Sequence, residues 1–511
     1  MPGGITELAG VSRIFYHYAP FVIPAAFQTV SGMSGLALST SLLLPLGLLI
    51  AALGIYTFAI ELGGRVSGLV TLTVIICIPA YSFLIQSGWF DFYWLLLIAP
   101  GSGYAIGVSV VVCASTVKYL DKRDFRILWL SLLLLSALVF IRAQMFLLLA
   151  PTIIAVVLLQ RYRANTNIIS RILGVLITIG FLTLHFSASV RTKWTEYAAT
   201  QAYLNFATNS SSFYGNLLTI SADLPFGLTM LTQVMIILIA VLGIYIFLYP
   251  LLFWIKLHSN GFNENDAIPI FLVLFFIGLM LFSPIAKNGD FSEYKHRHFL
   301  LLYVIISIYT IYYAIRCVIN FEFIVSNLRS IANELVILVI SVTIFANWGS
   351  NPARPDIEKL PWTGDYHNQH ITPGLIEITR YLRINAKEGD VLVMGLLSVL
   401  SSDPSTPIVQ IVSLTGIPAF VARSDLKIRG SQCVQEVVRK RLSILKELSL
   451  MDEWSVARSF LQTNGIRWYI STMGENPKWD LSLKESVFSS NGISVYDAEI
   501  NSNKILKENK C

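Results

Sequence analysis

A short group of charged side chains, Lys295-His296-Arg297, stands directly before a long apolar run. A guanidinium offers a fork of donors and an ammonium offers a compact charge, so these residues together could bind a phosphate-like anion. Cations in this position can equally anchor the end of a helix at the lipid headgroups. Glu293 and Asp290, a few residues earlier, could pair with the cations or accept a proton from a bound molecule.

Carboxylates that could act as a general acid or base are scarce elsewhere in the apolar part of the chain. Glu7 is the first acidic residue, and Asp91 lies within an aromatic run. His17, between Tyr16 and Tyr18, could donate a hydrogen bond to a sugar or a phosphate. Each residue has an ordinary alternative, because Glu7 could belong to a frayed terminus and the aromatic runs could be interfacial belts.

The amino-acid composition indicates whether these side chains belong to a soluble or a membrane protein. Of 511 residues, 55% are hydrophobic and 13% are charged, with a mean hydropathy of +0.65. Too little polar surface remains to cover a water-soluble globule of this size, so a soluble enzyme is excluded. The charged fraction rises from about 9% over 1–347 to about 23% over 348–511, which predicts a membrane domain followed by a soluble domain.

A membrane-spanning helix needs about 20 apolar residues. The apolar runs therefore predict a polytopic α-helical protein with about ten spans, and the pair at 126–141 and 144–160 could instead be a re-entrant hairpin. The ten segments are 37–61, 66–88, 102–119, 126–141, 144–160, 170–187, 229–255, 267–286, 299–318 and 331–347.

Lys and Arg in short loops indicate which side of the membrane is cytoplasmic. The loop at 118–126 carries four of them, and the stretch at 161–171 carries three, so both are predicted to lie inside. The loops predicted to lie outside are 1–35, 89–101, 188–228 and 287–298, together with the tail from 348.

The long outside loop at 188–228 is a candidate lid or binding element, since long ordered loops tend to be functional. Arg191 and Lys193 lie near its start and could contact an anionic ligand.

Three domains follow from this pattern: 1–35 as an outside loop and interfacial helix, 36–347 as the transmembrane domain, and 348–511 as a soluble α/β domain on the outer side. In the last, helices are expected at about 374–386, 431–449 and 454–463. Strands are expected at 390–394, at 408–413 or 419–421, and at 467–471. Cys433 and Cys511 could pair if the domain faces an oxidising compartment.

Several local patterns resemble the GT-C superfamily of polytopic membrane glycosyltransferases. The patterns are Tyr16-His17-Tyr18-Ala19-Pro20 with Ser31-Gly32-Met33-Ser34, the loop 289–298, Leu414-Thr415-Gly416-Ile417-Pro418-Ala419-Phe420, and Asn464-Gly465-Ile466-Arg467-Trp468-Tyr469-Ile470 with Val495-Tyr496. The resemblance covers most of the chain. The superfamily includes protein mannosyltransferase-like and aminoarabinose-transferase-like members.

The resemblance implies a multi-pass protein of a bacterial inner membrane that takes a polyprenyl-phosphate-linked sugar as donor. The acceptor would be a glycan, a lipid or a protein, and a divalent cation is left open as cofactor. In the superfamily, an acidic residue of the first outside loop serves the acceptor, often within an Asp/Glu pair. Here the loop offers Glu7 alone and one span fewer precedes it, so we expect an internal start, a fragment or an inactive relative.

Other functions receive less support from the residues. The sequence contains no phosphate-binding glycine loop, zinc motif or Cys/His nucleophile pattern. Nucleic-acid binding is disfavoured because no basic patch remains once the membrane topology has explained the positions of the Lys and Arg residues. A transporter or flippase of lipid-linked glycans, a glycan polymerase or ligase, and a non-catalytic membrane assembly subunit remain as alternatives. No internal repeat of the kind that transporters often show is visible.

Overall fold

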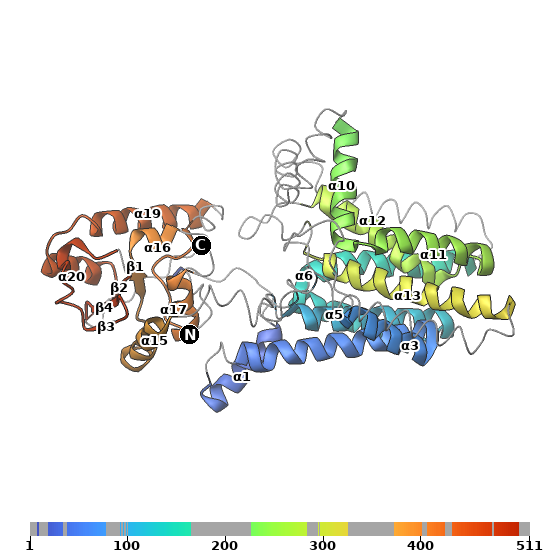
Figure 1. Cartoon of the computed structure of the whole chain (residues 1–511), viewed down its shortest axis with the longest axis horizontal. Helices are drawn as coiled ribbons and strands as arrows, with labels where there is room; N and C mark the ends of the chain where they lie inside the picture. The colour runs from blue at the N-terminus through green and yellow to red at the C-terminus, as the bar shows by residue number, and fades with distance from the viewer. Residues whose placement is uncertain are drawn as a thin grey trace, which may run out of the picture.

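The structure is a computed structural model in which apolar helices form a bundle and the last part of the chain forms a separate small domain (Figure 1). It describes residues 8–9, 19–33, 38–77, 92, 96, 99, 101–164, 226–283, 295, 297–324, 372–400, 406–424, 432–472 and 475–499. The predicted spans 170–187 and 331–347 lie outside these residues.

Hydrophobic helices make up the first part of the chain. In the described part, five helices are long and apolar enough to cross a membrane, or six if one sharply bent pair is counted as a span. The elements are η1 (Ala19–Phe21), α1 (Val22–Ser31), η2 (Ser39–Leu43), α3 (Leu44–Cys77), α5 (Gly101–Lys122), α6 (Phe125–Ala164), α10 (Phe226–Leu242), α11 (Tyr245–Asn260), η4 (Glu264–Asp266), α12 (Ala267–Phe282) and α13 (Phe299–Ile324).

Helix α3 is folded back on itself at Gly64. This residue has φ +80° and ψ −176°, a conformation that favours glycine because it has no Cβ. A Cβ on Gly68 would lie 2.7 Å from the side chain of Ile60 and 2.9 Å from that of Tyr56. A straight helix would hold residues 56 and 68 about 18 Å apart, so the two halves are antiparallel. The fold-back occurs where the sequence separates the predicted spans 37–61 and 66–88.

Helix α6 makes a second hairpin, at Arg142, whose φ of −163° and ψ of 95° are not helical. Before the break, Ser131 bonds to Thr116 of α5 at 3.1 Å. After it, the Gln160 side chain donates to the carbonyl of Leu120 at 3.1 Å. Both halves therefore run along α5 in opposite directions, and the break falls between the predicted segments 126–141 and 144–160.

The segment predicted as one span at 229–255 is broken. Helices α10 and α11 meet at Gly243 with a bend of 89°. The continuous apolar run gives no sign of this bend, although Gly243, with φ +54°, marks its position. In Figure 1, α10 stands across the bundle while α11 lies along it.

Ionic contacts gather the predicted inside loops at one end of the bundle. Lys118 lies 3.8 Å from Glu61, and Arg123 lies 3.4 Å from Glu264. We call this the basic end. At the other end lie the start of α5, the turn at Arg142 and the end of α12. We call it the domain end, because the small domain lies beyond it (Figure 1).

Glycines allow α3 and α5 to pack closely. A Cβ on Gly103 would lie 2.5 Å from the backbone of Gly47, and one on Gly107 would lie 2.5 Å from Cγ2 and 2.6 Å from the carbonyl oxygen of Ile50. Small residues at a helix crossing let two backbones approach, which is a common basis of helix association in lipid.

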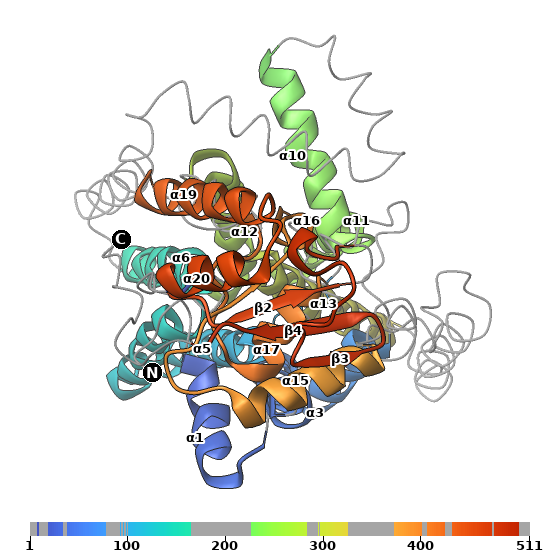
Figure 2. The same cartoon turned by 90° about the vertical axis from the view of Figure 1, so that its left-hand side faces the viewer.

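The C-terminal domain has its own hydrophobic core, around a four-stranded sheet in the order β1-β2-β4-β3. Strand β1 pairs with β2 in parallel, and the other pairs are antiparallel. Figure 2 shows α19 and α20 above the sheet and α15 below it. The elements are α15 (Pro373–Asn385), β1 (Leu392–Met394), α16 (Leu396–Leu400), α17 (Pro407–Thr415), α19 (Gln432–Leu448), α20 (Trp454–Thr463), β2 (Trp468–Ser471), η7 (Lys478–Asp480), β3 (Phe488–Ser490) and β4 (Ile493–Asp497).

The three helices expected in this domain are confirmed, as are the strands at 390–394 and 467–471. Of the two options for a further strand, 408–413 is wrong because it lies in α17. Pro407 occupies the first turn of that helix and Gly416 ends it in a left-handed conformation. Ala419 instead forms a parallel bridge with Leu392 at the edge of the sheet.

Replacing Gly107 by Ala should destabilise the bundle. The added methyl group would overlap Ile50, and overpacking of this kind costs about 1–3 kcal/mol. Thermal unfolding in detergent, followed by tryptophan fluorescence, should show a lower midpoint. The matched variant Ser115→Ala removes only a bond to a carbonyl of its own helix and should unfold near the wild-type temperature. Equal midpoints for the two variants would contradict the crossing.

The two ends of the bundle should face opposite sides of the membrane. A cysteine at Lys122, an exposed residue of the basic end, should react with a membrane-impermeant maleimide only after spheroplasts are permeabilised. A cysteine at Ser443, exposed on α19, should react in intact spheroplasts. The reverse pattern would invert the predicted orientation.

Candidate functional site

Most side chains proposed for chemistry lie outside the described part of the chain. Of the ten, the structure describes Lys295 and Arg297, both at the domain end. The eight that lie outside the described residues are Glu7, His17, Asp91, Arg191, Lys193, Asp290, Glu293 and His296.

Lys295 is completely buried. Its ammonium donates to the carbonyl oxygens of Met280 at 3.3 Å and Ser283 at 3.1 Å. These carbonyls belong to the C-terminal end of α12, where the helix dipole favours a positive charge. The ammonium therefore satisfies oxygens that have no partner within the helix and caps the end of α12, a role different from the expected anchor at the lipid headgroups.

The residues that follow Lys295 also pack into the bundle. His298 is buried, and its ring contacts Phe276 edge to face at 5.0 Å between centroids. Arg297 is half-buried. Its guanidinium is the more accessible of the two cations near the end of α12.

Arg142 is a candidate site residue that the sequence patterns did not single out. It is 5% exposed, and its guanidinium donates to the hydroxyl of Ser102 in the first turn of α5. The sequence does contain one indication of this role, namely a single arginine between two apolar runs. A charged side chain within a membrane segment is energetically costly and usually functional.

Two further contacts place the N-terminal part of the chain beside Arg142 and Ser102. The Tyr104 hydroxyl donates to the carbonyl of Leu43 at 3.1 Å. A Cβ on Gly101 would lie 3.2 Å from the ring of Pro20 in η1. The start of α5 is thus surrounded by Arg142, η1 and the beginning of α3.

Charge is handled differently at the two ends of the bundle. At the basic end, the buried ammonium of Lys256 pairs with the Asp266 carboxylate, which also accepts a hydrogen bond from Tyr313 at 2.9 Å. At the domain end, the oxygens that Arg142 and Lys295 contact are a hydroxyl and two carbonyls.

No metal centre is found among the side chains that the structure describes. Within them, no group of three or more His, Cys, Asp and Glu residues could hold a metal ion.

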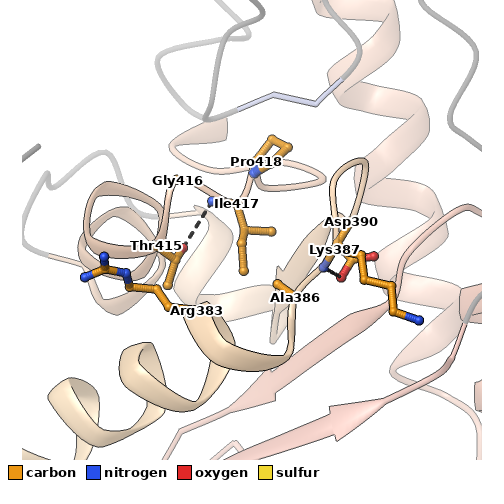
Figure 3. Close-up of a pocket in the computed structure, with 8 residues that line it drawn as sticks. All are labelled: Arg383, Ala386, Lys387, Asp390, Thr415, Gly416, Ile417 and Pro418. Atoms are coloured by element: carbon orange, nitrogen blue, oxygen red, sulfur yellow. Dashed lines mark hydrogen bonds between the residues drawn. The ribbon is translucent and has the colours of Figure 1, made fainter. Parts of the chain in front are cut away.

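The C-terminal domain contains a pocket of about 220 Å³ between the ends of α15 and α17 (Figure 3). Arg383 and Lys387 line it, but both helices point their C-terminal carbonyls toward it. Asp390, also in its wall, accepts a bond from the Lys387 backbone at 2.8 Å. Helix C-termini and a carboxylate disfavour anions, so the two cations complement local negative charge and do not form a phosphate site.

The motif around Arg467 has a structural explanation. Its guanidinium donates to both carboxylate oxygens of Asp497 at 3.0 Å and to Asp390 at 2.8 Å, and it lies 4.3 Å from the Trp468 ring centroid. These contacts join the start of β1 to the end of β4. The motif therefore has a structural role in the sheet, and the Arg467 guanidinium is paired with two carboxylates.

Cys433 on α19 is in a disulfide bond whose partner lies outside the described residues, while Cys113 and Cys317 are free. A disulfide in this domain is consistent with an oxidising compartment.

Neither a protein-family model nor a curated protein sequence matches the chain. The solved structures similar to it include the archaeal oligosaccharyltransferase AglB from Archaeoglobus fulgidus, in complex with an inhibitory peptide and a dolichol-phosphate. The similarity covers 90% of this chain and 62% of that chain, at 10% identity and a TM-score of 0.45. The chain thus spans less than two-thirds of the length of AglB, and a TM-score below 0.5 does not establish a shared fold.

Replacing Lys295 by Met should destabilise the protein, because two buried carbonyls lose a charged donor at a cost of about 1–3 kcal/mol. The apparent melting temperature in detergent should fall. Arg297→Met, at a half-buried neighbouring position, should have a smaller effect. If Arg297→Met were the more destabilising variant, the capping role of Lys295 would be wrong.

Proposed function

We propose that the protein is a GT-C-like membrane glycosyltransferase that moves a sugar from a polyprenyl-phosphate donor to a glycan, lipid or protein acceptor at the outer membrane face. The observation that carries this proposal is the pair of buried cations, Arg142 and Lys295, at the end of the bundle that lies next to the C-terminal domain. Cationic side chains at the end of an apolar bundle suit an amphiphile with an anionic head and a hydrocarbon tail.

The sequence patterns described above support the same function. The hairpins at Gly64 and Arg142 fit the predicted ten-span topology, in which the domain end faces outward. The disulfide of Cys433 fits an outer location for the C-terminal domain.

Roles for individual residues follow from the chemistry. Arg142 and Arg297 contact the donor phosphate, and Lys295 adds positive charge from within the bundle. Glu7 accepts a proton from the acceptor, whose freed electron pair attacks the anomeric carbon of the sugar. The bond between that carbon and the phosphate oxygen then breaks, and the phosphate leaves with the negative charge that the cations stabilise.

The remaining candidates have supporting roles in this proposal. Asp91 is the alternative acid or base, and the others bind substrate. The substrate-binding candidates are His17, Arg191, Lys193, Glu293 and His296.

Donor binding tests the proposal directly. The purified protein in nanodiscs should bind a fluorescent polyprenyl phosphate, and Arg142→Lys should weaken binding about tenfold because a guanidinium fork is replaced by a single ammonium. The matched variant Arg123→Lys, at the basic end, should bind as the wild type does. Glu7→Gln should bind the donor normally and fail to transfer sugar.

Three results would contradict the proposal. Absence of donor binding by the wild type would remove it. Binding of lipid-linked glycan followed by its appearance on the opposite leaflet, without sugar transfer, would identify a flippase. Equal loss of binding in the Arg142 and Arg123 variants would show that the domain end is not the phosphate site.

A further inference from the structure

The length of α5 places the basic end at the level of the lipid headgroups. This helix runs from the domain end to the basic end over Gly101–Lys122, and its 22 residues are about 33 Å long. The hydrocarbon core of a bilayer is about 30 Å thick. With the start of α5 at one boundary of the hydrocarbon, its last residue, Lys122, therefore lies at the other.

Exposed aromatic side chains mark the same level. Phe125 is 67% exposed, Trp129 is 66% exposed and Trp254 is 58% exposed. The first two belong to the first two turns of α6, and the third lies near the end of α11, with the His258 ring 4.4 Å away between centroids. Aromatic rings at the ends of membrane helices are typical of the headgroup region.

Most carboxylates of the basic end already have partners within the protein. The carboxylate of Asp124 accepts a hydrogen bond from the backbone amide of Arg126 at 2.9 Å, at the start of α6. Three others take part in ion pairs, so little negative charge is left at this end for further cations. The ion pairs are Lys118–Glu61, Arg123–Glu264 and Lys256–Asp266.

Exposed cations of the basic end remain outside these ion pairs. Five of them form no ion pair with any residue that the structure describes. Their like charges repel one another, so the group is stabilised by anions that come from outside the protein. The five are Arg65, Lys122, Arg126, Arg161 and Arg316.

A buried cation of the C-terminal domain shows the opposite arrangement. Arg441 is 3% exposed, and its guanidinium donates to the carbonyls of Phe420 and Ala9, the latter at 2.6 Å. The Ala9 amide donates to the carbonyl of Ala419 at 2.8 Å, and Leu8 is fully buried in the same core, so residues 8–9 add to the edge of the sheet. The protein itself supplies the partners of this cation, whereas the five cations of the basic end are open to partners from outside.

We infer that the basic end is a binding surface for the headgroups of anionic phospholipids, centred on the turn between α5 and α6. Lys122 and Arg126 lie on either side of this turn, and Trp129 lies one helical turn beyond Arg126. The two cations bind the lipid phosphate, and the Trp129 indole packs beside the headgroup. A zwitterionic lipid carries its own ammonium, which offsets this attraction. The inference goes beyond the proposed function and does not rest on it.

Quenching of Trp129 fluorescence by brominated lipid tests this surface. The full-length protein is reconstituted in phosphatidylcholine vesicles that contain a minority of brominated phosphatidylglycerol, and comparison with Trp129→Phe isolates the signal of Trp129. Quenching should exceed the value expected from the bulk share of phosphatidylglycerol, because the cations enrich this lipid around them. The enrichment should shrink as salt rises from about 0.1 M to about 1 M, since screening shortens the reach of exposed charges.

Charge removal locates the surface. The double variant Lys122→Gln/Arg126→Gln should lower the association constant of phosphatidylglycerol relative to phosphatidylcholine at least about tenfold. The matched double variant Arg439→Gln/Lys440→Gln removes two exposed cations of α19 and should keep the wild-type value. Both variants change exposed side chains, so their thermal midpoints in phosphatidylcholine should stay near that of the wild type.

Three results would overturn the inference. The first is quenching of the wild type at the bulk value. The second is wild-type enrichment in Lys122→Gln/Arg126→Gln, and the third is an equal loss of enrichment in the two double variants.

Discussion

The structure depends on one constraint: a backbone or a charge that enters an apolar bundle needs a partner from the protein itself. The breaks in the helices follow this rule. At Arg142, the side chain reaches the hydroxyl of Ser102, and at the end of α12 the ammonium of Lys295 reaches two carbonyls. At the basic end, Asp266 accepts bonds from Lys256 and from the Asn263 backbone, the latter at 2.7 Å. The buried charges that the structure describes in the bundle therefore lie at its two ends.

Much of the membrane part could be predicted because apolar length and charge report directly on burial in lipid. Gly64 and Arg142 interrupt apolar runs, and the chain folds back at both. The bend between α10 and α11 could not be predicted in this way. Hydropathy is continuous through Gly243, and it carries no information on the direction of the helix axis. In the C-terminal domain, the strand proposed at 408–413 failed because the cap residues Pro407 and Gly416 outweigh a short run of branched side chains.

The candidate site was predicted less well than the fold. Lys295 and Arg297 were chosen for their charge, but sequence alone could not tell that the carbonyl oxygens of a helix end would surround the first. The sequence does not bring Arg142 together with its partner, because Ser102 lies in α5, 40 positions earlier in the chain. The contact between Ala9 and Arg441 joins positions 432 apart, and no local pattern of either segment indicates the other.

That last contact also imposes an order on synthesis. The edge of the sheet that receives residues 8–9, and Arg441, leave the ribosome more than 400 residues after them. At 5–20 residues per second the early segment waits roughly 20–90 s for its partners. During this interval, its buried face and hydrogen-bonding edge have no place in the sheet. We therefore expect the nascent chain to need a holding factor or the membrane surface until the domain built around β1–β4 is complete.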